Sequence, residues 1–143
     1  MKNIRFSYVK VNALESFEEG LYKATNTLLT EGVFESFYLK EIVDVIHKHG
    51  PYMAITDDTL VLHAQRYDYI KDPFIAYLYS EKSVQFFGKS IHHMFVFGAK
   101  DETNHLNILS TLSHFITKLK ESNGLSSEAR MKQWLINHLE TKS

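Results

Sequence analysis

The chain contains eight histidines and no cysteine, so imidazoles are its candidate nucleophiles and general bases at neutral pH. Two of these histidines occupy distinctive positions. His63 ends the apolar run "TLVLHA", and His105 follows "DETN" at the beginning of a helical pattern. An imidazole displayed at either position could act as a ligand, a base or a carrier of phosphate.

His63 belongs to a short strand pattern. Strict alternation places Leu60 and Leu62 on one face of the strand, with Val61 and His63 on the other face. A histidine at a strand end is more often structural, with its ring bonded to a carbonyl group or to water. From the pattern alone, we leave the structural and the chemical interpretation of His63 open.

His105 directly follows Asn104, a favourable N-cap, so the sequence predicts a helix that places His105 in its first turn. Unpaired backbone N–H groups and the positive end of the helix dipole gather at such a position, which suits a phosphate group. A neutral imidazole there can donate one hydrogen bond to a phosphoryl oxygen. The alternative is that His105 merely follows the cap and faces solvent.

Other histidines and other standard sites are weaker candidates. His92 and His93 are consecutive in a predicted strand and must point to opposite faces, so they cannot both serve one site. No histidine spacing typical of a zinc site occurs, and the phosphate-binding glycine loop, the dinucleotide fingerprint and the serine elbow are missing. We expect no metal and no cofactor.

The composition excludes several classes of function. The 143 residues carry a net charge of −1, which gives no electrostatic basis for binding nucleic acid or anionic lipid. The longest apolar runs fall far short of the roughly 20 residues that a membrane helix requires, and the N-terminus lacks the apolar segment of a signal peptide. We expect a single cytoplasmic domain over residues 1–143, with no nucleic-acid partner and no membrane insertion.

The first third of the chain predicts one strand and two helices. Alternating apolar positions over residues 4–11 favour a strand. Ser16 and Glu19 form a capping box that opens the first helix, and Gly32 is placed to end it. A second helix follows and stops at Gly50, which precedes a proline.

The remainder predicts a block of strands and then two helices. The runs "YMAIT", "TLVLHA", "FIAYLY" and "IHHMFVF" are rich in β-branched and aromatic residues, as strands are. Helical spacing returns at Asn104, Gly124 closes that helix, and Ser126 or Ser127 can cap the last one. The order predicts a single α/β layered domain with a mixed sheet of about five strands flanked by helices.

Three segments together resemble a known family: "GPYMAI", "LVLHA" and "FFGKSIHHMFVFGAKDETNHLNILSTLSHFI". The arrangement resembles the type-2 enzyme IIA domain of the bacterial phosphotransferase sugar-uptake system, the mannitol/fructose/ascorbate class, and is closest to its ascorbate-like branch. In that family a "GPY" segment leads to a "PHA" histidine, and a downstream "D-x-x-x-H-L" opens a helix. Here residues 50–52, His63 with Ala64, and residues 101–106 occupy those places.

The resemblance implies roles for both histidines. His63 would accept a phosphoryl group from the histidine-containing phosphocarrier protein and pass it to a cysteine of a sugar-specific enzyme IIB. His105 would bind the phosphoryl oxygens, and the domain could associate with a membrane enzyme IIC complex. Arg66, Lys48 and His49 are all candidates to supply positive charge to the site.

The sequence also departs from the family pattern. The family usually reads "APGIALPHA" where this chain reads "TDDTLVLHA", so Asp57, Asp58 and Leu62 are unusual, and Gln65 replaces an arginine. Carboxylates that face the site would repel a phosphoryl group by about 1 kcal/mol each in water. Two functions therefore stay open: an active phosphoryl carrier, and a divergent or regulatory enzyme IIA-like module, as in sugar-responsive transcription regulation, that acts by protein binding with little or no phosphotransfer.

Overall fold

The computed structural model describes residues 4–121 and 128–142. The described elements are β1 (Arg5–Val11), α1 (Phe17–Thr30), α2 (Phe37–His49), η1 (Gly50–Met53), β2 (Thr59–Leu62), η2 (Tyr67–Tyr69), β3 (Phe74–Phe86), β4 (Lys89–Gly98), α3 (Glu102–Glu121) and α4 (Glu128–Lys142), where η marks a short 3-10 helix. The predicted helix end at Gly124 and the caps at Ser126 or Ser127 lie outside the described residues.

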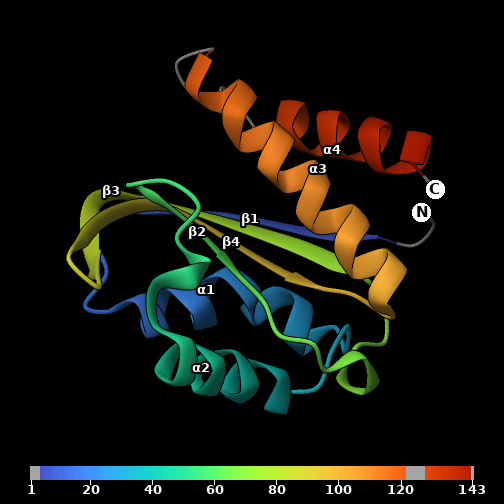
Figure 1. Ribbon diagram of the computed structural model, residues 1–143, viewed down its shortest axis with the longest axis horizontal. Helices are drawn as coiled ribbons and strands as arrows, with labels where there is room; N and C mark the ends of the chain where they lie inside the picture. Colours follow the sequence, from blue (N-terminus) through green and yellow to red (C-terminus); the bar gives the residue numbers. More distant parts are fainter. Residues whose placement is uncertain (1–3, 122–127, 143) are drawn as a thin grey trace.

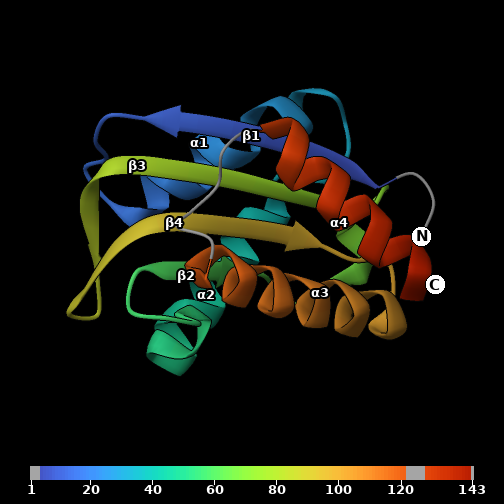
Figure 2. The same ribbon diagram turned by 90° about the horizontal axis from the view of Figure 1, so that it is seen from above.

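The strands form one mixed sheet in the order β1-β3-β4-β2. β1 is parallel to β3, β2 is parallel to β4, and the central pair β3 and β4 is antiparallel. Helices α1 and α2 cover one face, and α3 and α4 lie side by side over the other (Figures 1 and 2). The predicted α/β layered domain with a mixed sheet is confirmed, and β2 is an edge strand.

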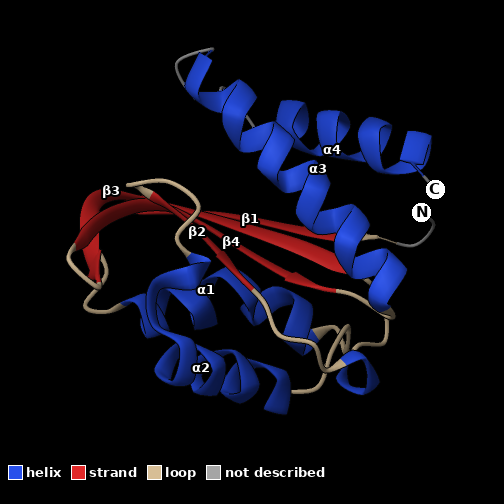
Figure 3. Cartoon of the chain, in the orientation of Figure 1, coloured by secondary structure: helices blue, strands red, loops and turns tan. Residues whose placement is uncertain are grey.

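The described sheet has four strands rather than about five, because "YMAIT" does not form one (Figure 3). Gly50 ends α2 with a φ of 69° and turns the chain directly into η1. Pro51 has no N–H to donate to a strand ladder. Extended pairing is therefore limited to a single antiparallel bridge between Ala54 and Leu60.

The ends of α1 follow the predicted capping chemistry. The Ser16 hydroxyl accepts a hydrogen bond from the backbone N–H of Glu19 at 3.1 Å. At the other end Gly32 has a φ of 75°, and the N–H groups of Gly32 and Val33 donate to carbonyls of the last turn at 3.0 Å each. These caps determine where the chain leaves the helix and turns toward α2.

Two hydrophobic cores lie on the two faces of the sheet, and β2 contributes to both. Leu60 and Leu62 are buried in the core shared with α1 and α2, whereas Val61 is buried in the core shared with α3 and α4. The predicted alternation is confirmed. It places His63, the next residue after β2, on the α3 side of the sheet.

Candidate functional site

His63 and His105, far apart in the sequence, lie next to each other in the structure. Their ring centroids are 5.1 Å apart, and the ring planes are inclined by 64°. His63 directly follows β2, and His105 lies in the first turns of α3, which follows β4. Because β2 and β4 are parallel neighbours, their carboxyl ends lie at the same edge of the sheet and bring both imidazoles there.

Aromatic rings surround this pair of imidazoles. The ring of Phe97 stacks on His63 with centroids 4.8 Å apart, and it lies 5.0 Å from the ring of His105. The ring centroid of Tyr67 lies 6.1 Å from that of His105. His105 is 3% exposed and His63 is half-buried. The pair therefore lies in a largely apolar environment at the end of the edge strand.

The tautomer of His63 follows from its one backbone contact. Nδ1 lies 3.0 Å from the carbonyl oxygen of Val61. A carbonyl only accepts, so Nδ1 carries the ring hydrogen and Nε2 carries the free lone pair. Burial lowers the pKa of His63 to about 4; the bond to Val61 opposes this shift, and the neighbouring His105 adds to it. At neutral pH the imidazole is neutral, with Nε2 available as a nucleophile.

His105 carries a buried polar atom without a partner. Its Nδ1 has no hydrogen bond in the described structure. Burial lowers the pKa of His105, opposed by Glu102, so this ring is also neutral at neutral pH. Because an unpaired buried N–H is more costly than an unpaired acceptor, we assign the ring hydrogen to Nε2. His105 then has one N–H to donate to a ligand.

The first turn of α3 begins earlier than predicted. The carboxylate of Asp101 accepts the backbone N–H of Asn104 at 2.7 Å, and the helix starts at Glu102. The prediction of Asn104 as N-cap is therefore wrong, because Asp101, an equally good cap, precedes it. The backbone N–H of His105 already donates to the carbonyl of Asp101 at 2.9 Å. His105 thus contributes its side chain, rather than its backbone amide, to the site.

The chain matches, over residues 4–141, the family described as the phosphoenolpyruvate-dependent sugar phosphotransferase system, EIIA 2. The chain belongs to this family. Among proteins with curated functions, none matches the sequence. Membership identifies an enzyme IIA of the phosphotransferase system, a component of sugar transport.

Solved structures share the enzyme IIA fold. The mannitol-specific cryptic phosphotransferase enzyme IIA of Escherichia coli matches with a TM-score of 0.74 and 18% identity, covering 93% of this chain and 91% of that chain. Enzyme IIAMtl of Escherichia coli, in complex with phosphorylated enzyme IIBMtl, matches with a TM-score of 0.69 and 15% identity over 94% of each chain. Nitrogen regulatory protein IIA-Ntr of Neisseria meningitidis matches with a TM-score of 0.70 and 20% identity, covering 90% and 92%.

The cationic side chains suggested for this enzyme IIA lie in different places. The Arg66 guanidinium pairs with Glu41 at 2.9 Å and with Asp68 at 3.1 Å, so two carboxylates balance its charge. Lys48 and His49 are exposed in the last turn of α2, in the layer across the sheet from His105. Among the described residues, no hydrogen bond or ion pair joins any of the three cations to the imidazole pair.

The unusual residues before β2 lie away from the imidazole pair. Asp57 is exposed and pairs with Lys89 at 3.1 Å. Asp58 lies just before β2, about 16 Å from His63 at about 3.3 Å per residue. Leu62, where the family usually has proline, is buried and extends the strand ladder. The contact of Asp57 with Lys89 and the position of Asp58 before β2 place both carboxylates away from the imidazole pair.

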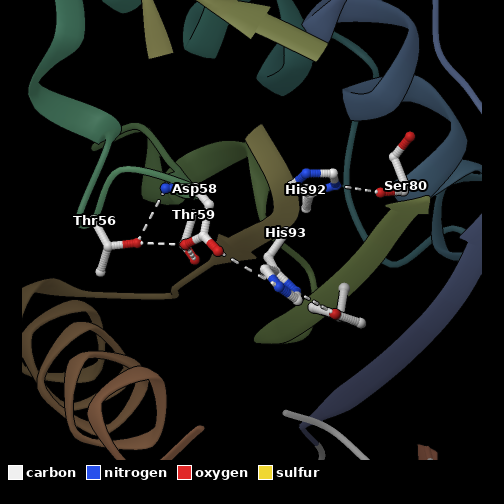
Figure 4. Close-up of polar contacts among 7 residues, drawn as sticks. Thr56, Asp58, Thr59, Ser80, His92 and His93 are labelled. Carbon is white, nitrogen blue, oxygen red and sulfur yellow. Dashed lines mark hydrogen bonds and ion pairs between the residues drawn. The ribbon is translucent and has the colours of Figure 1, made fainter. Parts of the chain in front are cut away.

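His92 and His93 point away from each other, as predicted (Figure 4). Nδ1 of His92 donates to the carbonyl of Ser80 at 2.9 Å. Nδ1 of His93 lies 2.7 Å from the Tyr77 hydroxyl, and its Nε2 lies 4.0 Å from the carboxylate of Asp58. Burial lowers the pKa of His93, and Asp58 opposes that shift. Both histidines lie in β4, where His93 pairs with Thr59 at the start of β2, at the opposite end of that strand from His63.

Two residues of the site were not predicted from the sequence. Phe97 shields both imidazoles, and Tyr38 bonds to the backbone beside them. The signal for Tyr38 was its position on the apolar face of a helix, where a buried hydroxyl requires a partner. No sequence signal identifies Phe97, because its position beside His63 depends on the register between β2 and β4, in which Leu62 pairs with Val96.

Within the described residues, no helix has the length and apolar character needed to cross a membrane. The same residues contain no group of three or more histidine, cysteine, aspartate or glutamate side chains arranged to hold a metal ion.

Proposed function

We propose that this enzyme IIA accepts a phosphoryl group on Nε2 of His63 from the histidine-containing phosphocarrier protein and passes it to enzyme IIB. The observation that carries the proposal is the pairing of His63 with His105 at 5.1 Å. Nδ1 of His63 is bonded to Val61, which leaves Nε2 as the nucleophile. The residue types, the family and the geometry support the same chemistry.

The first transfer needs no proton to leave His63. The lone pair of Nε2 attacks the phosphorus of the donor's phosphohistidine, and a new N–P bond forms while the donor's P–N bond breaks. The electron pair of the broken bond returns to the donor imidazole. The N–H at Nδ1, bonded to Val61, stabilises the positive charge that the phosphorylated ring acquires.

The second transfer reverses the roles at His63. A cysteine thiolate of enzyme IIB attacks the phosphorus, an S–P bond forms, and the electron pair of the N–P bond returns to Nε2. In both steps negative charge spreads over the phosphoryl oxygens, so positioned donors supply most of the catalysis. We assign this role to the Nε2–H of His105. No metal or nucleotide is part of either step.

The proposal also includes enzyme IIB as a partner and the ascorbate-like branch of the family. A structure of enzyme IIAMtl with phosphorylated enzyme IIBMtl shares this fold and supports an enzyme IIB partner. The order of the segments "GPYMAI", "LVLHA" and "FFGKSIHHMFVFGAKDETNHLNILSTLSHFI", taken together, supports the ascorbate-like branch. We propose a cytoplasmic location, beside an enzyme IIC complex.

Among the three candidate cations, we propose that Arg66 rather than Lys48 or His49 supplies positive charge to the site, because Arg66 lies on the segment that follows His63.

The direct test is phosphorylation of the purified chain with phosphoenolpyruvate, enzyme I and the phosphocarrier protein. We expect one acid-labile phosphate per chain in the wild type and none in His63→Gln. His92→Gln is the matched control, because its ring is bonded to a carbonyl away from the site. A wild type that takes no label, or a His63→Gln chain labelled like the wild type, contradicts the proposal.

The second candidate is a regulatory enzyme IIA-like module that acts by binding a partner. The fold shared with nitrogen regulatory protein IIA-Ntr supports it, as does Leu62 in place of the usual proline. The ion pairs of Arg66 with Glu41 and Asp68 balance its charge, which is also consistent with slow phosphorylation. Loss of sugar uptake by a reconstituted transport complex on His63→Ala would exclude this candidate.

A further inference from the structure

The hydroxyl of Tyr38 connects two backbone groups that flank the imidazole pair. It donates a hydrogen bond to the carbonyl of Phe97 at 2.7 Å, the shorter of its two acceptor contacts, and accepts one from the N–H of Ala64 at 3.0 Å; the carbonyl of Ala64 lies 3.1 Å away. Ala64 directly follows His63, and Phe97 carries the ring on which His63 stacks. Tyr38 is 0% exposed, so these bonds form without competition from bulk water.

This connection lies where the ladder between β2 and β4 ends. The last paired residues are Leu62 and Val96, and the next position along would set His63 opposite Phe97. At this position the Tyr38 hydroxyl lies between the N–H of Ala64 and the carbonyl of Phe97 and forms a hydrogen bond with each. It therefore holds them farther apart than a direct hydrogen bond of about 2.9 Å would.

The ring and the hydroxyl of Tyr38 serve different parts of the molecule. The ring packs against Phe34 and Phe74 in the core between α2 and the sheet, with centroids about 6 Å away in each case. Only the hydroxyl reaches the backbone beside His63. Burial raises the pKa of this hydroxyl well above its usual range, so it remains a donor at any pH at which the protein is studied.

We propose that Tyr38 is a positioning residue for His63. Its hydroxyl fixes the backbone after His63 relative to Phe97, and so holds the imidazole in its stacked orientation with Nε2 presented to the donor. The effect on activity rests on the function proposed above, whereas the effect on the ring of His63 rests on the structure alone. Loss of the hydroxyl would leave a buried N–H and a buried carbonyl unpaired at this point.

Tyr38→Phe tests this role because it keeps the packed ring and removes only the hydroxyl. Tyr77→Phe is the matched control, since Tyr77 is equally buried and its hydroxyl bonds to a different imidazole, that of His93. The first readout is the NMR titration of the His63 ring in the unphosphorylated chain. The second is phosphotransfer from the phosphocarrier protein, with kcat and KM measured separately.

We expect Tyr38→Phe to raise the pKa of His63 by at least half a unit, because a looser ring is better hydrated. We expect kcat to fall about tenfold or more, with KM changed less than about threefold, because positioning acts on the reacting geometry. Tyr77→Phe should leave both readouts at their wild-type values. An unchanged His63 titration in Tyr38→Phe, or an equal change in Tyr77→Phe, overturns the proposal.

Two outcomes require a further measurement: a Tyr38→Phe chain that does not fold, and a wild type that accepts no phosphoryl group. If Tyr38→Phe does not fold, 3-fluorotyrosine at position 38 keeps both bonds and alters their strength; shifted His63 ring resonances support the proposal, and an unchanged spectrum overturns it. If the wild type accepts no phosphoryl group, the proposed function fails on its own. The titration of His63 then still decides the role of Tyr38.

Discussion

The imidazole of His63 lies parallel to the ring of Phe97, with centroids 4.8 Å apart and ring planes inclined by 18°. The same phenyl ring borders His105 at 5.0 Å. One side chain thus removes water from both imidazoles. Burial is the main cause of the low pKa of His63, and Phe97 contributes to that burial without contributing a polar atom.

Phe97→Leu is expected to raise the pKa of His63 from about 4 toward its usual 6.5, because water gains access to the ring. The lost packing should lower the free energy of unfolding by about 1–2 kcal/mol. NMR titration and denaturant unfolding measure the two effects. Phe95→Leu is the control, since Phe95 is equally buried but contacts Phe115 and Tyr77; it should lose similar stability and leave the His63 titration unchanged. A His63 pKa that does not move in Phe97→Leu would contradict this account.

His105→Leu is expected to slow phosphotransfer without lowering the free energy of unfolding. The substitution removes the buried Nδ1 that has no partner, so the free energy of unfolding should stay the same or rise by about 1 kcal/mol. Phosphotransfer to His63 should fall about 100-fold, because one donor to the phosphoryl oxygens is lost. Thermal unfolding and single-turnover phosphorylation measure the two effects. Wild-type transfer rates in a folded His105→Leu chain would remove His105 from the mechanism.

The folded protein is expected to lose stability as the pH falls from 6.5 to 4. In this window the unfolded chain binds a proton at residue 63, whereas the folded chain, with a pKa of about 4, does not. Protonation therefore favours the unfolded state, and the full shift corresponds to about 3 kcal/mol. Burial lowers the pKa of His93 and of His105 as well, which acts in the same direction. Urea unfolding at pH 7 and pH 5 should show a smaller loss in His63→Gln than in the wild type; equal losses would be inconsistent with a buried neutral His63.

Asp68→Asn is expected to release Arg66 from one of its two carboxylates. If Arg66 is the cation that meets the phosphoryl group, transfer should become about threefold faster, since more positive charge faces the transition state. The pair is exposed, so the free energy of unfolding should change little. Arg66→Gln should slow transfer. Unchanged rates in both variants would show that Arg66 serves only to hold the segment after His63.

Phe87→Asn is expected to stabilise the hairpin that joins β3 and β4. Phe87 has a φ of 48° and is followed by Gly88 with a φ of 81°, so the turn requires two consecutive left-handed residues. A bulky side chain is unfavourable in that region, and Phe87 is 55% exposed, so little packing is lost. The free energy of unfolding should rise by about 0.5–1 kcal/mol, seen as a higher Tm. A lower Tm would mean that the contact between Phe86 and Phe87 outweighs the backbone strain.

Local patterns in the sequence predicted the features that depend on neighbouring residues. The cap at Ser16, the turn at Gly32 and the alternation around Val61 each follow from the chemistry of a few adjacent side chains, and each is confirmed. Where two local signals compete, the prediction failed. Asp101 and Asn104 are both good caps, and nothing in the local pattern shows that the earlier one begins α3.

Contacts between distant segments could not be predicted in the same way. The stacking of Phe97 on His63 depends on the register between β2 and β4, and the bond from Tyr38 depends on how α2 packs beneath both strands. Periodicity assigns a residue to a face but does not identify its partner across the sheet. The resemblance to the enzyme IIA family was therefore the only basis in the sequence for bringing His63 and His105 together.

The bonds of Tyr38 join positions 26 and 59 residues away from it. Contacts at such separations close large loops and form after the local helices and hairpins. A chain in which α2, the edge strand and the central hairpin have not yet assembled would contain every chemical group of the site and still be unable to take up phosphate. Uptake of label during refolding would therefore report the completion of assembly, later than a helical signal does.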